Sequence, residues 1–170
     1  MRSELGKECR KLFRKMMAVE FPDYKEEKDQ VVPQGWYVWR HQHQSGLFFW
    51  IFLVIHHSRD EFTTEAGWSF DANKPPWTMI GGREEMERIL SKPLAFRTCR
   101  LWCQDNWGYW WVFVLRPEEY KRAILYKDDP IEQCLPLVAP AVWEAGEKIK
   151  EFVIPVFEEV VRKQGSIRIK

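Results

Sequence analysis

The stretch from Leu47 to Ile55 constrains the fold more than any other part of the chain, because its nine residues are all apolar. It is about half as long as a transmembrane helix requires. A short apolar run of this kind is typical of a central β-strand that is buried on both faces. Ser45-Gly46 precedes it and suits a two-residue hairpin turn from an earlier strand, Trp36 to His43. The sequence therefore predicts a sheet built around a strand from Leu47 to His57.

Helical patterns flank this sheet on both sides. Apolar residues recur at helical spacing from Ser3 to Ala18 and again from Ala141 to Gln164. Pro136 and Pro140 should interrupt the segment before the last helix, and Pro155 should kink that helix. Further strands are predicted at Phe62–Phe70, Arg97–Gln104 and Tyr109–Leu115. We therefore expect a single α+β domain over residues 1–170, with an antiparallel sheet of about five strands flanked by an N-terminal helix and C-terminal helices.

The hairpin turns decide which side chains share a face of the sheet, because successive residues of a strand point to opposite sides. A turn at Ser45-Gly46 places His41 opposite Trp50. A turn at Arg59-Asp60 sets the register of the following strand, Phe62–Phe70. One face is then a core that helices cover, with Trp36, Val38, Phe49, Ile51, Leu53, Ile55, Phe62, Ala66, Trp68 and Phe70. The other, here called the predicted aromatic face, holds Tyr37, Trp39, His41, His43, Phe48, Trp50, Phe52, Glu65, Gly67, Ser69 and Asp71. The alternative that a C-terminal helix covers this face too stays open.

The outline also resembles a group of small bacterial proteins that are classed only as a domain of unknown function. The likeness lies in Leu12-Phe13, Trp36 to His41, Phe48 to Ile55, and Glu65 to Ser69. These proteins have an N-terminal helix, an aromatic antiparallel sheet and a C-terminal helix. Small proteins of this kind are sometimes immunity or defence components. The resemblance therefore implies a role in partner binding, and it implies no catalytic residue.

Charge and cysteine content narrow the function classes further. The formal net charge is +1, whereas a dedicated nucleic-acid binder usually carries a clear basic excess. Residues 1–21 lack the uninterrupted apolar stretch of a signal peptide, so we expect a cytoplasmic protein with no membrane association. The cysteines are then expected to be free thiols, at Cys9, Cys99, Cys103 and Cys134.

The sequence has no phosphate-binding glycine loop, no nucleophile elbow and no zinc-binding helix. Its histidines fall at the two ends of one predicted hairpin, His41 and His43 at one and His56 and His57 at the other, roughly 20 Å apart. They cannot share one ion, and we expect neither a metal nor another cofactor.

The predicted aromatic face is the candidate site, because rings mixed with a few polar groups are typical of a pocket or contact patch. The binding residues predicted from the sequence are Tyr37, Trp39, His41, His43, Trp50, Ser69, Asp71 and the loop residue Trp77. Trp and Tyr are enriched where proteins meet their partners. We therefore favour a protein-binding module over an enzyme, and an exposed face of this kind would also permit a homodimer.

Two other functions stay open. The first is a small-molecule-binding protein or hydrolase-like enzyme, with His41 as general base and Glu65 or Asp71 as a second acid–base group. The second is a single-stranded nucleic-acid binder, with bases stacked on Trp39 and Trp50.

Overall fold

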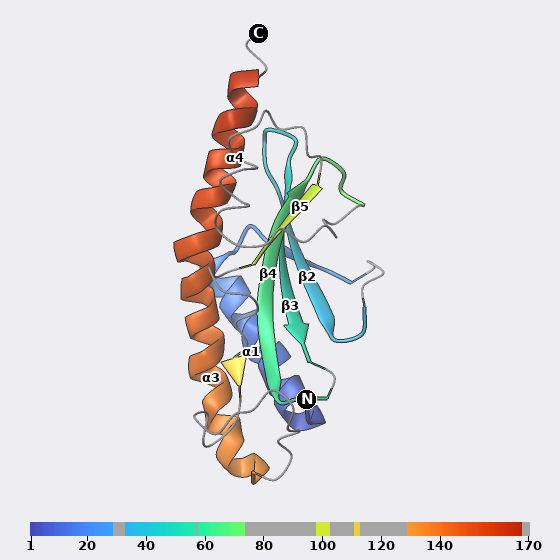
Figure 1. Cartoon of the computed structure of the whole chain (residues 1–170), viewed down its shortest axis with the longest axis vertical. Helices are drawn as coiled ribbons and strands as arrows, with labels where there is room; N and C mark the ends of the chain where they lie inside the picture. The colour runs from blue at the N-terminus through green and yellow to red at the C-terminus, as the bar shows by residue number, and fades with distance from the viewer. Residues whose placement is uncertain (29–32, 57, 74–97, 103–110, 113–128, 168–170) are drawn as a thin grey trace.

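The computed structural model describes residues 1–28, 33–56, 58–73, 98–102, 111–112 and 129–167 (Figure 1). One helix precedes a run of strands, and a long helical segment follows them. The elements are α1 Ser3–Glu20, β1 Lys25–Glu27, β2 Trp36–Gln42, β3 Phe48–Ile55, β4 Glu61–Ser69, β5 Thr98–Trp102, β6 Trp111–Val112, α3 Ile131–Lys148, the π-helix η2 Ile149–Val153 and α4 Ile154–Ile167.

Four strands, β1 to β4, make the body of an antiparallel sheet in which each strand pairs with the next along the chain. The short strands β5 and β6 both pair with β4, at different parts of its length. The α+β class, the antiparallel sheet and the flanking helices are confirmed. The predicted count of about five strands is wrong, since the described residues form the four strands of this body plus the short β5 and β6, and the sequence pattern did not predict β1. Its residues, Lys25-Glu26-Glu27, are all charged and carry no alternating apolar pattern.

The pairing of β2 with β3 differs by one residue from the prediction. His41 lies opposite Phe49, not opposite Trp50. The cause is the turn: the N–H of Gly46 donates to the carbonyl of His43, and the N–H of His43 donates to the carbonyl of Leu47. With Gly46 at a φ of +84°, this is a three-residue loop that ends in a left-handed glycine. The extra loop residue moves every β2 side chain to the face opposite the one expected.

The pairing of β3 with β4 differs by two residues from the prediction, so the faces of these strands are as expected. Phe52 lies opposite Glu65 and Ile55 opposite Phe62. The N–H of His56 donates to the carbonyl of Glu61, which makes the connection two residues longer than a turn at Arg59-Asp60 requires. A shift by two preserves the alternation of side chains.

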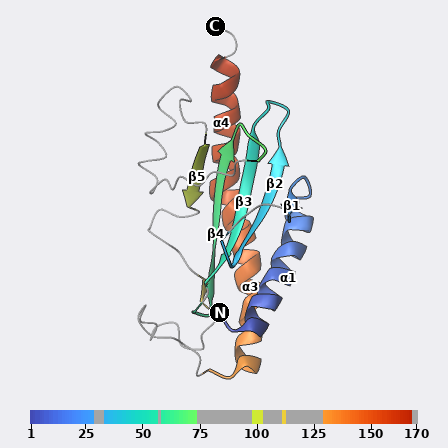
Figure 2. The same ribbon diagram turned by 90° about the vertical axis from the view of Figure 1, so that its right-hand side faces the viewer.

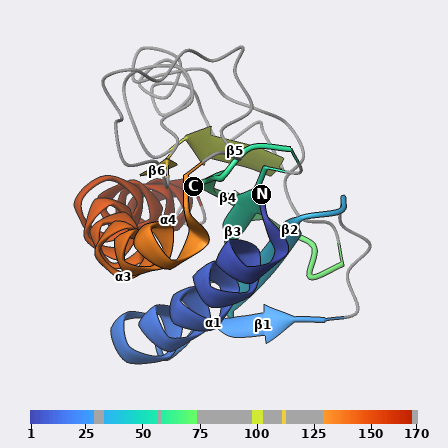
Figure 3. The ribbon, with the colours of Figure 1, turned by 90° about the horizontal axis from the view of Figure 1, so that it is seen from below.

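All the described helices pack against one face of the sheet (Figure 3). The apolar stripe of α1, with Leu5, Cys9, Phe13, Met16 and Met17, is buried there, as the helical spacing predicted. It joins sheet residues in one large core, which includes Trp39, Phe49, Ile51, Leu53, Phe62, Ala66 and Trp68. Trp39 belongs to this core because of the one-residue shift of β2.

The segment α3–η2–α4 runs along the whole length of the sheet (Figure 2). Pro136 and Pro140 do not interrupt it, contrary to the prediction, since α3 continues through both. The π-helix η2 ends two residues before Pro155, at the place where a proline deprives the preceding turn of an N–H donor. Where α3 passes α1, Gly146 is buried against Met16, and a Cβ at position 146 would lie 2.9 Å from the Met16 sulfur.

The second face of the sheet is buried as well. Val38, Trp50, Phe52 and Val54 form a separate buried cluster, and Trp50 and Phe52 have no exposed surface. The central strand β3 is thus buried on both sides, as its unbroken apolar sequence indicated.

Candidate functional site

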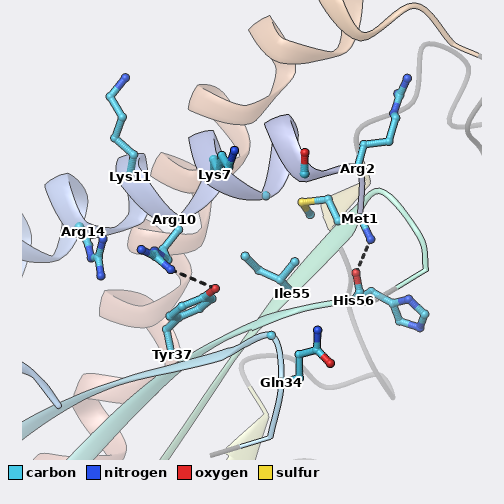
Figure 4. A pocket seen from close by; sticks show the side chains of 13 residues that line it. Met1, Arg2, Lys7, Arg10, Lys11, Arg14, Gln34, Tyr37, Ile55 and His56 are labelled. Atoms are coloured by element: carbon cyan, nitrogen blue, oxygen red, sulfur yellow. Dashed lines mark hydrogen bonds between the residues drawn. The ribbon is translucent and has the colours of Figure 1, made fainter. Parts of the chain in front are cut away.

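A groove of about 670 Å³ lies between α1 and the neighbouring ends of β2 and β3 (Figure 4). Ligand sites in proteins commonly enclose about 300–1,000 Å³. The groove is lined by Met1, Arg2, Ser3, Gly6, Lys7, Arg10, Lys11, Arg14, Gln34, Gly35, Tyr37, Ile55 and His56. Its size and position make it the candidate site in the described part of the chain.

One wall of the groove is the polar face of α1. Lys7, Arg10 and Arg14 are spaced three and four residues apart, with Gly6 beside Lys7, so they share a face of the helix. The apolar stripe of the same helix is fixed against the core and therefore directs these cations outward. The amphipathic pattern of α1 thus builds this wall.

The opposite wall begins at Gly35, just before β2. This glycine has a φ of +86°, and a Cβ on it would lie only 2.6 Å from the backbone oxygen of Ile55. Its carbonyl accepts the N–H of Ile55 at 2.8 Å. Only glycine combines this backbone conformation with so close an approach. Gly35 thereby holds Gln34 and Tyr37 against the end of β3, across from α1.

The charge of the groove is one-sided. Five lining residues are Lys or Arg, and none of the described lining residues is Asp or Glu. Three of these cations are compensated by carboxylates outside the lining, in the pairs Arg2–Asp60 at 2.7 Å, Lys11–Glu8 at 3.1 Å and Arg14–Glu26 at 2.6 Å. The hydrogen bonds with Glu26 raise the pKa of the Arg14 guanidinium above its ordinary value.

The other two cations, Lys7 and Arg10, form no ion pair with any described residue. Lys7 is exposed, and Arg10 is half-buried. Figure 4 shows Arg10 directed at Tyr37 across the groove, whereas Lys11 points away from the sheet wall. The Arg10 Nη1 donates to the Tyr37 hydroxyl at 3.3 Å, and its Cζ lies 4.9 Å from the ring centroid. The groove therefore carries two positive charges that have no ion-pair partner among the described residues, and one of them contacts an aromatic ring.

His56 closes one end of the groove. Its carbonyl accepts a hydrogen bond of 2.5 Å from the Met1 amino group (Figure 4). Its ring Nδ1 accepts the backbone N–H groups of Ser58 at 3.2 Å and Arg59 at 3.1 Å. These bonds tie the His56 ring to the loop that follows β3.

The binding residues predicted from the sequence do not form one site. Tyr37, Trp39 and His41 share the helix-covered face, and His43 lies beyond β2, its ring near His41 and Phe49. Trp50 and Ser69 lie on the opposite face, and Asp71 follows β4. Tyr37 is the member of the set that lines the groove. Trp77 lies outside the described residues.

The structure does bring three of the predicted residues together. The indole Nε1 of Trp50 donates to the Ser69 hydroxyl at 2.9 Å, and that hydroxyl donates to the carbonyl of Asp71 at 2.8 Å. The Arg40 guanidinium lies over the Trp50 ring, with its Cζ 5.7 Å from the centroid. Trp50 and Ser69 are fully buried, so these two side chains belong to the interior and offer no contact surface.

The proposed acid–base pair of His41 and Glu65 is not formed, because the two residues lie on opposite faces of the sheet. The His41 ring stacks on Phe49 and contacts Tyr24, while Glu65 is buried on the other side. Over the residues that the structure describes, no group of three or more His, Cys, Asp or Glu side chains is placed to hold a metal ion. In the same residues, no helix is both long enough and apolar enough to cross a membrane.

The basic groove was not predicted from the sequence. Lys7, Arg10 and Arg14 were visible as cations off the apolar stripe of the first helix. The wall that faces them could not be found from sequence, since it depends on the close approach of Gly35 to β3. Comparison of the chain with protein-family models, curated proteins and solved structures finds no match.

Proposed function

We propose that the protein is a binding module whose basic groove receives an acidic segment of a partner protein. One observation carries the proposal: Lys7 and Arg10 both line a hollow in which no described lining residue is negative, and no described carboxylate forms an ion pair with them. Carboxylates of a partner would form charge-assisted hydrogen bonds there, which are about twice as strong as neutral ones. An immunity or defence role, which the family resemblance implies, would be exercised through this groove.

An acidic protein segment fits the charge of the molecule better than a nucleic acid does. The net charge is +1, and only two cations of the groove lack a described carboxylate partner. Nucleic-acid binding depends on neutralising many successive phosphates. Two cations match two carboxylates, and complementary charge of this kind favours fast and selective association between proteins.

The groove replaces the predicted aromatic face as the site that we propose for the partner. Trp50 and Phe52 have no exposed surface, so a partner could reach them only if the sheet were uncovered. The groove is open, and its cations are at least partly exposed.

The test uses a fluorescein-labelled hexaglutamate peptide and fluorescence anisotropy at low salt. We expect the double variant Lys7→Glu/Arg10→Glu to bind it at least about tenfold more weakly than the wild type, a loss of about 1.4 kcal/mol. The matched control is Lys15→Glu/Lys25→Glu. It makes the same change in net charge at two exposed positions outside the groove lining, and it should bind within about threefold of the wild type.

Equal binding by the wild type and the groove variant would contradict the proposal, as would equal losses in the two double variants. A hexathymidylate oligonucleotide and inorganic pyrophosphate serve as competing probes. If either binds more tightly than hexaglutamate and still requires Lys7 and Arg10, the acidic protein partner is wrong and a phosphate-bearing ligand takes its place.

A further inference from the structure

We infer that Arg10, held against Tyr37, is the residue that binds a carboxylate of the partner and that Tyr37 positions the Arg10 guanidinium. This inference rests on the proposed function and assigns the recognition to one pair of residues. Arg10 is therefore a specificity-determining residue, and its geometry matters in addition to its charge.

The contacts of Arg10 leave most of its guanidinium N–H donors unbonded within the described chain. A guanidinium has five N–H donors in a rigid, planar arrangement that matches the two oxygens of a carboxylate. One nitrogen, Nη1, is used in the bond to the Tyr37 hydroxyl, and the Tyr37 ring lies 4.9 Å from Cζ. No carboxylate of the described chain bonds to the remaining N–H groups. The remaining donors are available to a ligand in the groove.

The two other arginines of the groove show what Arg10 lacks. Arg14 donates hydrogen bonds to the two carboxylate oxygens of Glu26, from Nε at 2.8 Å and from Nη2 at 2.6 Å. Arg2 holds Asp60 through its Nε at 2.7 Å and its backbone N–H at 2.6 Å. Each of these arginines is paired with a carboxylate of the same chain. Arg10 lies between them in the sequence and is not paired with a described carboxylate.

Tyr37 reduces the cost of binding by holding Arg10 in place before the partner arrives. An arginine side chain loses considerable rotamer freedom when it is immobilised in an interface, and a residue that is already ordered loses less. The ring supplies a cation–π contact, and the hydroxyl supplies the hydrogen bond that fixes the rotation of the guanidinium. Lys7, one turn earlier, adds charge without a fixed direction, because an ammonium is a point charge.

The experiment compares charge-conserving variants in the hexaglutamate assay. Arg10→Lys keeps the charge and loses the planar fork, so we expect about threefold to tenfold weaker binding. Arg162→Lys is the matched control: it makes the same substitution at an exposed arginine outside the groove lining, and it should bind like the wild type. Tyr37→Phe keeps the ring and loses the hydroxyl, so we expect about twofold to fivefold weaker binding.

A double-mutant cycle separates positioning from a structural role. Because Tyr37 acts through Arg10, adding Tyr37→Phe to Arg10→Lys should cause little further loss. Full additivity of the two losses would overturn the positioning role. Unchanged binding by Arg10→Lys would overturn the inference as a whole, and it would leave the proposed function standing if Lys7→Glu/Arg10→Glu still loses binding. If that charge-reversal variant binds normally, the proposed function itself fails.

Discussion

Alanine at Gly35 should destabilise the protein far more than alanine at Gly46. The two glycines have nearly the same backbone conformation, with φ values of +86° and +84°. Their surroundings differ: a Cβ at position 35 would lie 2.6 Å from the backbone oxygen of Ile55, and a Cβ at position 46 would meet nothing within 4 Å. The pair therefore isolates the close approach that builds one wall of the groove.

The magnitudes follow from these contacts. At Gly46, a left-handed alanine costs about 1–2 kcal/mol, and a stiffer unfolded chain offsets about 0.4–1 kcal/mol of that. We expect Gly46→Ala to lower the free energy of unfolding by about 1 kcal/mol. Gly35→Ala adds the crowding of a backbone atom, about 1–3 kcal/mol, and the loss of the Ile55 N–H bond to the Gly35 carbonyl, about 1 kcal/mol. Its total should reach about 3–5 kcal/mol.

Urea unfolding followed by tryptophan fluorescence measures both values under one set of conditions. A difference of about 2 kcal/mol or more between the two variants supports the close contact of Gly35 with β3. If the variants are equally stable, the approach of Gly35 to Ile55 is wrong, and so is the sheet wall of the groove.

Three further predictions concern the interior. Ser69→Ala should lower the free energy of unfolding by about 1–3 kcal/mol, because the buried Trp50 indole N–H loses its acceptor. In a Trp50→Phe background, which lacks this N–H, Ser69→Ala should cost less. Gly146→Ala should destabilise by about 1 kcal/mol through its contact with Met16, and this loss should shrink in a Met16→Ala background, which a double-mutant cycle in urea would measure. Burial raises the pKa of the Cys9 thiol, so the thiol stays protonated in the folded state and iodoacetamide should label it only as fast as the protein opens. This raised pKa favours folding fully below the ordinary thiol pKa of about 8.5. The advantage is lost as the pH rises toward the folded-state pKa, by up to about 1.4 kcal/mol per pH unit. In urea unfolding at pH 8 and above, the free energy of unfolding of Cys9→Ala should therefore fall less with pH than that of the wild type.

The helices and the central strand could be predicted from sequence because their patterns are long. The apolar positions of α1 and the unbroken run of β3 each admit one arrangement against a core. Strand β2 shows the limit of such reasoning. Ser45-Gly46 is compatible with a two-residue turn and with the end of a three-residue loop, and the two differ by one residue in register. That single residue decided on which face Trp39 and His41 lie.

Only one wall of the candidate site could be predicted from the sequence, for the same reason. The cations of α1 stand at helical spacing in the sequence, so one wall of the groove could be anticipated. The contact of Arg10 with Tyr37 could not, since the predicted register placed Tyr37 on the face away from the helices. The pairing of Arg2 with Asp60 and of Arg14 with Glu26, which leaves Arg10 as the open arginine, also depends on long-range packing.

The most direct test of the central claim is an NMR titration of the ¹⁵N-labelled protein with hexaglutamate. The groove holds two glycine amides, Gly6 and Gly35, and two probes lie outside its lining, the Gly46 amide and the buried Trp50 indole N–H. We predict that the signals of Gly6 and Gly35 shift with a common affinity while those of Gly46 and Trp50 stay in place. Shifts at Trp50 or Gly46 without shifts at Gly6 and Gly35 would contradict the assignment of binding to the groove.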